Sequence, residues 1–278
     1  MDHRGRSRSY LGVGKATVSI TADWIIPHPR RGVGHLWRSY RVMLRFEITN
    51  LRLFLMITLV IQTLVGAGMG IMYGFFLGDL SASSRMFLVS GIPALALFPL
   101  GFVLVPSVIA DHRFAETYDY IWSLPVPRLA SAAATFTVFA GLSLPGVVVA
   151  VGLSCWVYGV TLTPSLMIVP AAGLAAAMAT SVGYALGHSV RNPRMINPLT
   201  NLLVFLVLMF SPIVVPIERF PAWFGAIHQV LPFWHMANVL RDGLTSGLVD
   251  HIARSYAVLA TWLIAAWGVT TWVISRRG

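Results

Sequence analysis

The chain has 278 residues, of which 56% are hydrophobic and only 11% are charged, and its formal net charge at pH 7 is +10. Charged residues make up about 25% of an average soluble protein, so this composition excludes an ordinary soluble domain. A net positive charge can indicate nucleic-acid binding. Here half of the 20 basic residues precede the first long apolar stretch, which is better explained by membrane topology, and we expect no nucleic-acid partner.

Residues 1–34 form a basic tail that we expect to be disordered and cytoplasmic, with residues 35–278 forming one transmembrane domain. The tail has no apolar core of the kind that a signal peptide requires, so we predict no cleavable leader. The run from Gly12 to Thr17 superficially resembles a phosphate-binding loop. When Gly14 and Lys15 are aligned on that motif, its first position is Ser9 and its hydroxyl position is Ala16. We therefore predict no ATP site in this chain.

The segment His35–Arg52 is predicted to form an amphipathic helix that lies in the membrane surface. Apolar residues recur at spacings of three and four, which makes one stripe: Trp37, Tyr40, Leu44, Ile48 and Leu51. Basic residues occupy an adjacent face, from which they can reach lipid headgroups: Arg38, Arg41, Arg45 and Arg52. The alternative is a charged lead-in segment without a fixed orientation.

Six long apolar stretches follow, and none contains Asp, Glu, Lys or Arg: Leu53–Gly78, Leu88–Ala110, Ser131–Tyr158, Leu166–Gly187, Pro198–Pro216 and Ser255–Ser275. A helix needs about 20 apolar residues to cross a bilayer, and backbone groups in the hydrocarbon must be satisfied internally. The stretches are continuous rather than alternating, so the sequence predicts an all-α membrane protein with six transmembrane helices.

Basic residues are distributed unevenly over the two sides that six crossings create. With the N-terminus inside the cell, sixteen of the 20 fall on the cytoplasmic side, and only Arg85, Arg219, Arg241 and Arg254 fall outside. The positive-inside rule favours this orientation. We predict a multi-pass protein of the cell membrane with both termini in the cytoplasm.

The first cytoplasmic loop, Asp111–Arg128, is dense in charged and aromatic residues. Phe114 and Tyr118 share one helical face, Glu116 and Asp119 add negative charge, and two prolines end the element. Aromatic anchors with orienting charges are typical of protein interfaces, so we predict a docking helix. The alternative is a helix that lies among the lipid headgroups.

The external segment before the last span contains pieces that are too short to cross the membrane and too apolar for a free loop. Pro216, Pro221 and Pro232 divide it, and Trp223 and Trp234 each begin an apolar face. The pattern predicts two half-helices broken at Pro232 that re-enter the outer leaflet, where tryptophan is favoured.

Small residues in the spans predict close helix packing: Gly66 and Gly70, and Ala179, Gly183 and Gly187. These contacts could lie within one chain or form a dimer seam. The single cysteine, Cys155, is expected to serve as a packing residue.

Two runs resemble the membrane subunits of ABC-2 type exporters, a family that includes daunorubicin-resistance, nodulation-factor and polysaccharide exporters. The first is Ser123-Leu-Pro-Val-Pro-Arg128. The second is the run Ser211–Arg241, with its prolines, Glu218, Arg219 and Arg241. The order of the six spans agrees with the family as well. The resemblance covers the chain from about residue 34 onward. It departs at Ala115, where many relatives have glycine before the docking helix.

The resemblance implies a separate ATP-hydrolysing subunit that contacts the first cytoplasmic loop, which would give the docking role to Phe114, Glu116, Tyr118 and Asp119. It also implies a second membrane subunit, either a copy of this chain or a homologue, with the external helices over the exit of the path between them. Arg241 belongs to the matching external run. ATP and magnesium would bind the partner, and this chain would hold no cofactor or metal.

Energy from an ion gradient is not favoured, because ion-driven carriers place ionisable residues within their spans. The expected function is therefore export of a hydrophobic or amphipathic molecule, such as a drug or a lipid, through a non-enzymatic permease subunit. Export of a polysaccharide or lipid-linked glycan by the same architecture is the alternative. A membrane enzyme using His112 and Glu116, or His228 and His235, and a passive channel or scaffold are further alternatives.

Overall fold

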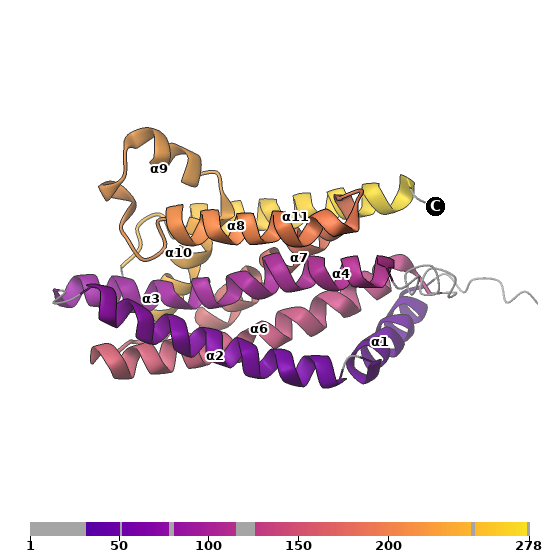
Figure 1. The fold of residues 1–278 in the computed structure, drawn as a ribbon, viewed down its shortest axis with the longest axis horizontal. Coiled ribbons are helices and arrows are strands. Elements are labelled where there is room, and N and C mark those ends of the chain that lie inside the picture. The colour runs from indigo at the N-terminus through magenta and orange to yellow at the C-terminus, as the bar shows by residue number, and fades with distance from the viewer. Residues whose placement is uncertain (1–31, 51, 78–80, 115–125, 246–247, 277–278) are drawn as a thin grey trace, which may run out of the picture.

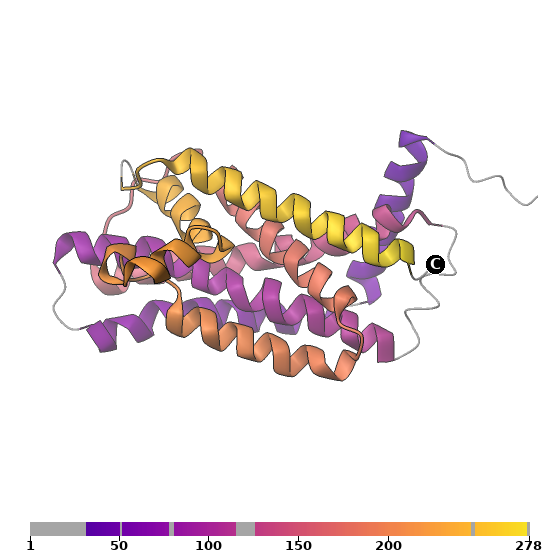
Figure 2. The same ribbon diagram turned by 90° about the horizontal axis from the view of Figure 1, so that it is seen from above.

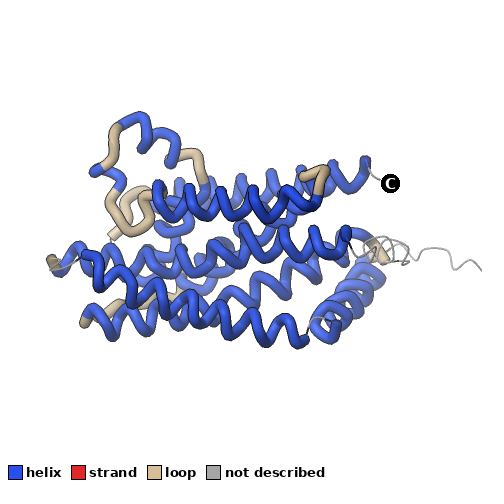
Figure 3. Tube along the Cα trace, in the orientation of Figure 1, coloured by secondary structure: helices blue, strands red, loops and turns tan. Residues whose placement is uncertain are grey.

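The structure is a computed structural model that describes residues 32–50, 52–77, 81–114, 126–245 and 248–276. In these ranges the ordered elements are all helical (Figure 3), which confirms the predicted fold class. Six of the described helices are long and apolar enough to cross a membrane, as predicted. The spans are α2 (Arg52–Leu77), a continuous helix made of α3 (Ala82–Pro99), η1 (Leu100–Leu104) and α4 (Val105–Phe114), then α6 (Arg128–Tyr158), α7 (Ile168–Ser189), α8 (Ile196–Phe210) and α11 (Ile252–Arg276).

The spans run side by side along the long axis of the molecule (Figures 1 and 2). The helix α1 (Val33–Asn50) and the C-terminal end of α11 lie at the same end of the bundle, while α9 (Ala222–His228) lies at the opposite end. Six crossings return the chain to the side on which it began, so this placement follows from the number of spans. Which side is cytoplasmic stays a prediction.

The second span is the centre of the bundle. In its most apolar window 83% of the residues are buried, against 17% in each of α8 and α11, which lie at the periphery. Its aromatic core consists of Phe98 and Phe102, which stack with ring centroids 4.4 Å apart and meet the edge of Phe233 from α10.

Prolines interrupt the second span, where η1 is a turn of π-helix. Pro99 has no N–H to donate, and the N–H of Leu100 donates to the carbonyl of Leu97. The Ala96 carbonyl accepts a hydrogen bond from the side chain of Gln62 in α2. Gln62 is buried, so it satisfies an irregular backbone inside the bundle, where water is absent.

The predicted small-residue contacts lie within the chain. A Cβ atom on Gly66 would collide with the carbonyl oxygen of Gly146 in α6, and one on Gly183 would collide with that of Gly101 in η1. The same two contacts continue along the helices. Gly70 approaches Ser154, Ala179 approaches Gly101, and Gly187 approaches Ile109. The alternative of a dimer seam is therefore wrong for these residues, because their faces are already occupied.

Two predicted boundaries need correction. The fifth span was expected to reach Pro216, but α8 ends at Phe210 because Pro212 forces Ser211 into extended backbone. The second span was expected to begin at Leu88, but α3 begins at Ala82 with Ser81 as its cap; the Ser81 hydroxyl accepts from the N–H of Ser84 at 3.3 Å.

The helix α1 confirms the predicted amphipathic segment as a helix, but the face that packs on α6 was not expected. Ser39, Met43 and Glu47 are buried there, while Trp37 and Ile48 of the predicted stripe are about half exposed. Tyr40 and Leu44 of the stripe are half-buried, so only part of the stripe is left exposed. Its location in the membrane surface stays a prediction.

Candidate functional site

The segment between α8 and α11, predicted to be external, folds as the expected pair of short helices. A 3-10 turn, η3 (Ile217–Arg219), leads into α9, and α10 (Pro232–Leu244) follows. Pro232 lies in the first turn of α10, where its missing N–H removes no helical hydrogen bond, and it keeps Leu231 extended. The predicted break at Pro232 is therefore confirmed.

The two short helices have different surroundings. α10 is buried among α3, α7 and α11, whereas α9 projects from the bundle (Figure 1) and leaves Trp223 67% exposed. Trp234 is half-buried, and Pro216 and Pro221 are the extended residues before η3 and α9. Hence α10 is part of the core. Entry of the pair into the outer leaflet stays a prediction.

Arg241, named from the sequence only as part of a matching run, is the largest fully buried side chain of the described core. Its Nε donates to Ser90 Oγ at 3.2 Å and its Nη1 to Asn238 Oδ1 at 2.9 Å. Its Nη2 donates to the carbonyls of Ile213 at 2.8 Å and Phe87 at 3.3 Å. The guanidinium therefore joins α10, α3 and the segment after α8.

The surroundings of Arg241 explain how a charge is tolerated there. Its four hydrogen-bond partners are uncharged, and the guanidinium carbon lies 3.6 Å from the ring centroid of Phe87. Burial lowers the pKa of Arg241 to about 9, opposed by Glu218, so the side chain keeps its charge at neutral pH. Gly91 permits the approach, because a Cβ there would lie 2.5 Å from the Ile213 oxygen and 2.9 Å from Arg241 Nη2.

His235 fixes α10 to α11. The sequence pattern indicated this residue only as part of the alternative of a membrane enzyme. Its Nε2 lies 3.0 Å from the carbonyl of Gln229 and must donate, so in the neutral ring Nδ1 accepts from the hydroxyl of Ser255 at 2.9 Å. Complete burial lowers the pKa of His235; the Gln229 carbonyl opposes this shift and Arg254 adds to it. The ring is therefore neutral at pH 7.

A cavity of about 450 Å³, which we call the outer cavity, lies beneath the external pair. Its polar lining residues are Ser211 and His228, and the rest of its wall is apolar or aromatic. The residues come from η1, α7, α8, α9, α10 and α11: Phe102, Val182, Leu186, Leu203, Leu206, Val207, Phe210, Leu231, Pro232, Phe233 and Trp262. Its size falls within the range of small-molecule sites, about 300–1,000 Å³.

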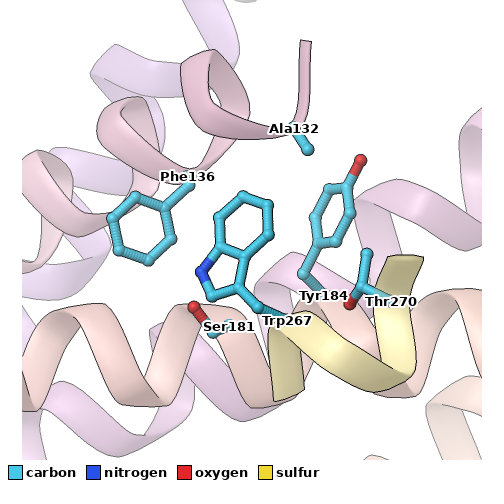
Figure 4. A pocket seen from close by; sticks show the side chains of 6 residues that line it. All are labelled: Ala132, Phe136, Ser181, Tyr184, Trp267 and Thr270. Carbon is cyan, nitrogen blue, oxygen red and sulfur yellow. The ribbon is translucent and has the colours of Figure 1, made fainter. Parts of the chain in front are cut away.

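A much smaller cavity of about 10 Å³ lies between α6, α7 and α11 (Figure 4). It is lined by Ala132, Phe136, Ser181, Tyr184, Trp267 and Thr270. That volume is near the minimum for one water molecule. The space is therefore too small for any ligand larger than a water. Among the described residues the buried Ser181 hydroxyl has no hydrogen-bond partner, and a water there could supply one.

The opposite end of the bundle carries part of the predicted docking loop. Phe114 ends α4 and is 51% exposed. Glu116, Tyr118 and Asp119 lie outside the described residues. The neighbouring Arg113 bonds to the carbonyls of Gly187, Val190 and Arg191 at 2.7–3.1 Å, which satisfies the C-terminal end of α7.

Two hydrogen bonds join α1 to the first turns of α6, directly after that loop. Tyr40 donates to Thr137 at 3.0 Å, and Thr135 donates to the carboxylate of Glu47 at 2.8 Å. Glu47 is only 4% exposed. It is the one acid in an otherwise basic helix, which is the signal that could have singled it out.

The alternative of a metal enzyme gains no support, because the described residues contain no group of three potential metal ligands. His228 and His235 instead bond to nearby protein groups.

Comparison with known families agrees with the sequence and the fold. A model described as ABC-2 type transporter matches residues 36–245, which is more than half of the chain. A search among curated proteins found no match. The matched region runs from α1 through the five following spans to the end of α10, so the chain belongs to the ABC-2 type transporter family and is the membrane component of an ABC transporter.

Proposed function

We propose that this chain is the permease subunit of an ATP-driven exporter, and that it moves a hydrophobic or amphipathic molecule from the cytoplasm or the inner leaflet to the outside. The observation that carries the proposal is the outer cavity, an apolar space of about 450 Å³ beneath the external helix pair. Such a space suits molecules that already partition into the bilayer.

The source of energy follows from the spans. Their middle portions carry no Asp, Glu, Lys or Arg, so protons or ions have no ionisable relay to act on. The work of transport must then come from a partner. In this proposal the ATPase subunit docks on the loop after α4, through Phe114, Glu116, Tyr118 and Asp119, and a second permease subunit completes the path.

The lining of the outer cavity supports a hydrophobic substrate over a glycan. A sugar chain presents a hydroxyl on almost every carbon, and each would need a hydrogen-bonding partner when it leaves water. The outer cavity offers only Ser211 and His228. Export of a drug or lipid therefore has better support from these residues.

The test is ATP hydrolysis by the chain reconstituted in liposomes with its ATPase subunit, measured across a panel of hydrophobic drugs, phospholipids and glycans. We expect drugs or lipids to stimulate hydrolysis and glycans to leave it unchanged. Stimulation by glycans alone would contradict the substrate class. Uptake of a solute by liposomes holding the chain alone, on imposing a proton or sodium gradient, would contradict the energy source.

A further inference from the structure

We propose that the outer cavity binds a hydrophobic molecule by accepting one hydrogen bond from it at Nε2 of His228. The inference names the substrate class of the proposed exporter and to that extent rests on the proposed function. The recognised molecule would combine an apolar body with a hydroxyl or amine donor.

The orientation of His228 determines which kind of polar group the outer cavity can receive. Its Nδ1 lies 3.1 Å from the carbonyl of Phe224, which can only accept, so Nδ1 carries the proton. In the neutral ring Nε2 is then an acceptor. Among the described residues Nε2 has no hydrogen-bond partner, although His228 is only 5% exposed and lines the outer cavity. Nε2 is not among the enclosed side-chain atoms without a partner, so it is accessible from the outer cavity. An acceptor in an apolar space gains a hydrogen bond from a ligand that supplies the donor.

The other polar groups around the outer cavity do not compete for that role. The indole N–H of Trp262 already donates to the carbonyl of Val230 at 2.8 Å, so Trp262 presents only its ring. The Ser211 hydroxyl can donate or accept and therefore does not discriminate between ligands. His228 alone sets the requirement for a donor.

The packing of α8 explains both the size of the outer cavity and the way into it. α8 packs chiefly on η1 and α4 and is not closed against α11. Leu206 and Phe210 line the outer cavity yet are 44% and 50% exposed, so the space opens on the flank of the bundle beside α8. An apolar molecule can therefore reach the outer cavity without passing through the close-packed core.

The experiment uses the purified full-length chain in detergent, without the ATPase, and a diazirine-bearing hexadecanol as photoreactive probe. Labelled residues are mapped by mass spectrometry, and unlabelled hexadecanol competes against its methyl ether, which has the same chain but no donor. We expect labelling of residues that line the outer cavity, and competition by the alcohol about tenfold stronger than by the ether, as one hydrogen bond in an apolar cavity would give.

Three variants locate the effect. His228→Phe should remove the preference for the alcohol, whereas His228→Gln, which keeps an acceptor at the same reach, should retain part of it. Leu203→Trp should fill the outer cavity and abolish labelling. Leu202→Trp is its matched control, because Leu202 lies on the same helix, is 55% exposed and does not line the outer cavity.

Equal competition by alcohol and ether in the unchanged chain would overturn the inference, and that comparison does not depend on any variant folding. Unchanged labelling of Leu203→Trp would also overturn it. Binding that depends on His228, in a complex whose ATPase no hydrophobic compound stimulates, would support the site and refute the proposed function. Stimulated transport without labelling at the outer cavity would support the proposed function and refute the site.

Discussion

Buried polar side chains hold together the end of the bundle that carries α10. Arg241 ties α10 to α3 and to the segment after α8, and His235 ties it to α11. Each is completely or almost completely buried and has its hydrogen bonds satisfied. Removing such a group leaves its partners unsatisfied, which costs more than the bond itself contributes.

Replacing Arg241 by methionine should destabilise the chain by about 2–4 kcal/mol, because the buried carbonyl of Ile213 and the buried amide oxygen of Asn238 lose this donor. Arg241→Lys should recover only part of this loss, since an ammonium group cannot reproduce the planar fork. Thermal unfolding in detergent measures the effect. The exposed Arg219 in η3 provides the control, and an equal melting temperature for Arg241→Met and Arg219→Met would contradict the anchoring role.

The pKa of His235 is lowered by burial, so the native state holds this ring neutral while the unfolded chain binds a proton below pH of about 6.5. Stability from His235 is therefore complete above that pH and declines as the pH falls below it. We expect the melting temperature to drop between about pH 7.5 and pH 5, and the drop to shrink in His235→Gln. His251→Asn, at an exposed residue, should keep the full drop; an unchanged drop in His235→Gln would exclude this histidine as the cause.

At the scale of elements, the bundle depends on positions where backbones touch. Gly66 and Gly70 let α2 approach α6, and Gly101 and Gly183 let η1 approach α7. In a membrane, where apolar side chains gain little by leaving lipid, such close packing supplies much of the attraction between helices.

A leucine at Gly66 should separate α2 from α6 and lower thermal stability, because its Cβ alone would overlap the carbonyl of Gly146. The matched control is Gly68→Leu on the same helix, where a Cβ meets nothing within 4 Å. The thermal stability of both variants, measured by size-exclusion chromatography after heating, tests the contact between α2 and α6. Equal loss in the two would indicate an effect of helix composition rather than of the contact.

At the scale of the molecule, the two ends of the bundle have different roles in the proposed exporter. The end with α9 and α10 carries the outer cavity, and the end with α1 and α4 carries the predicted docking surface. α1 is joined by two hydrogen bonds to the first turns of α6, at the same end as that predicted surface.

Changing Glu116, Tyr118 and Asp119 together to alanine should abolish co-purification of the ATPase subunit, because the predicted docking loop would lose two of its negative charges and one of its aromatic anchors. Phe114→Ala alone should weaken the complex. Changing Ser81, Ser83 and Ser84 at the opposite end of the bundle is the control and should leave the complex intact. A complex that survives the triple change would remove these residues from the interface.

The class of fold, the number of spans, the helix before them and the break at Pro232 could all be predicted from the amino-acid sequence. These follow from local physics: the length of uncharged apolar runs, their periodicity, and the missing donor of proline. The sequence also indicated the family, through residues that lie close together along the chain. The ends of helices were less secure, as α8 shows by stopping at Phe210.

The contacts between distant residues, in contrast, could not be predicted from the sequence. Nothing near Arg241 in the sequence indicates that Phe87, Ser90 and Ile213 receive its hydrogen bonds, and nothing in α1 indicates that Glu47 faces Thr135. The outer cavity also depends on packing between distant segments, and so does the position of His228, whose Nε2 faces that cavity without a protein partner among the described residues. Local patterns determine which segments are helices, whereas contacts between helices depend on shape complementarity over the whole bundle.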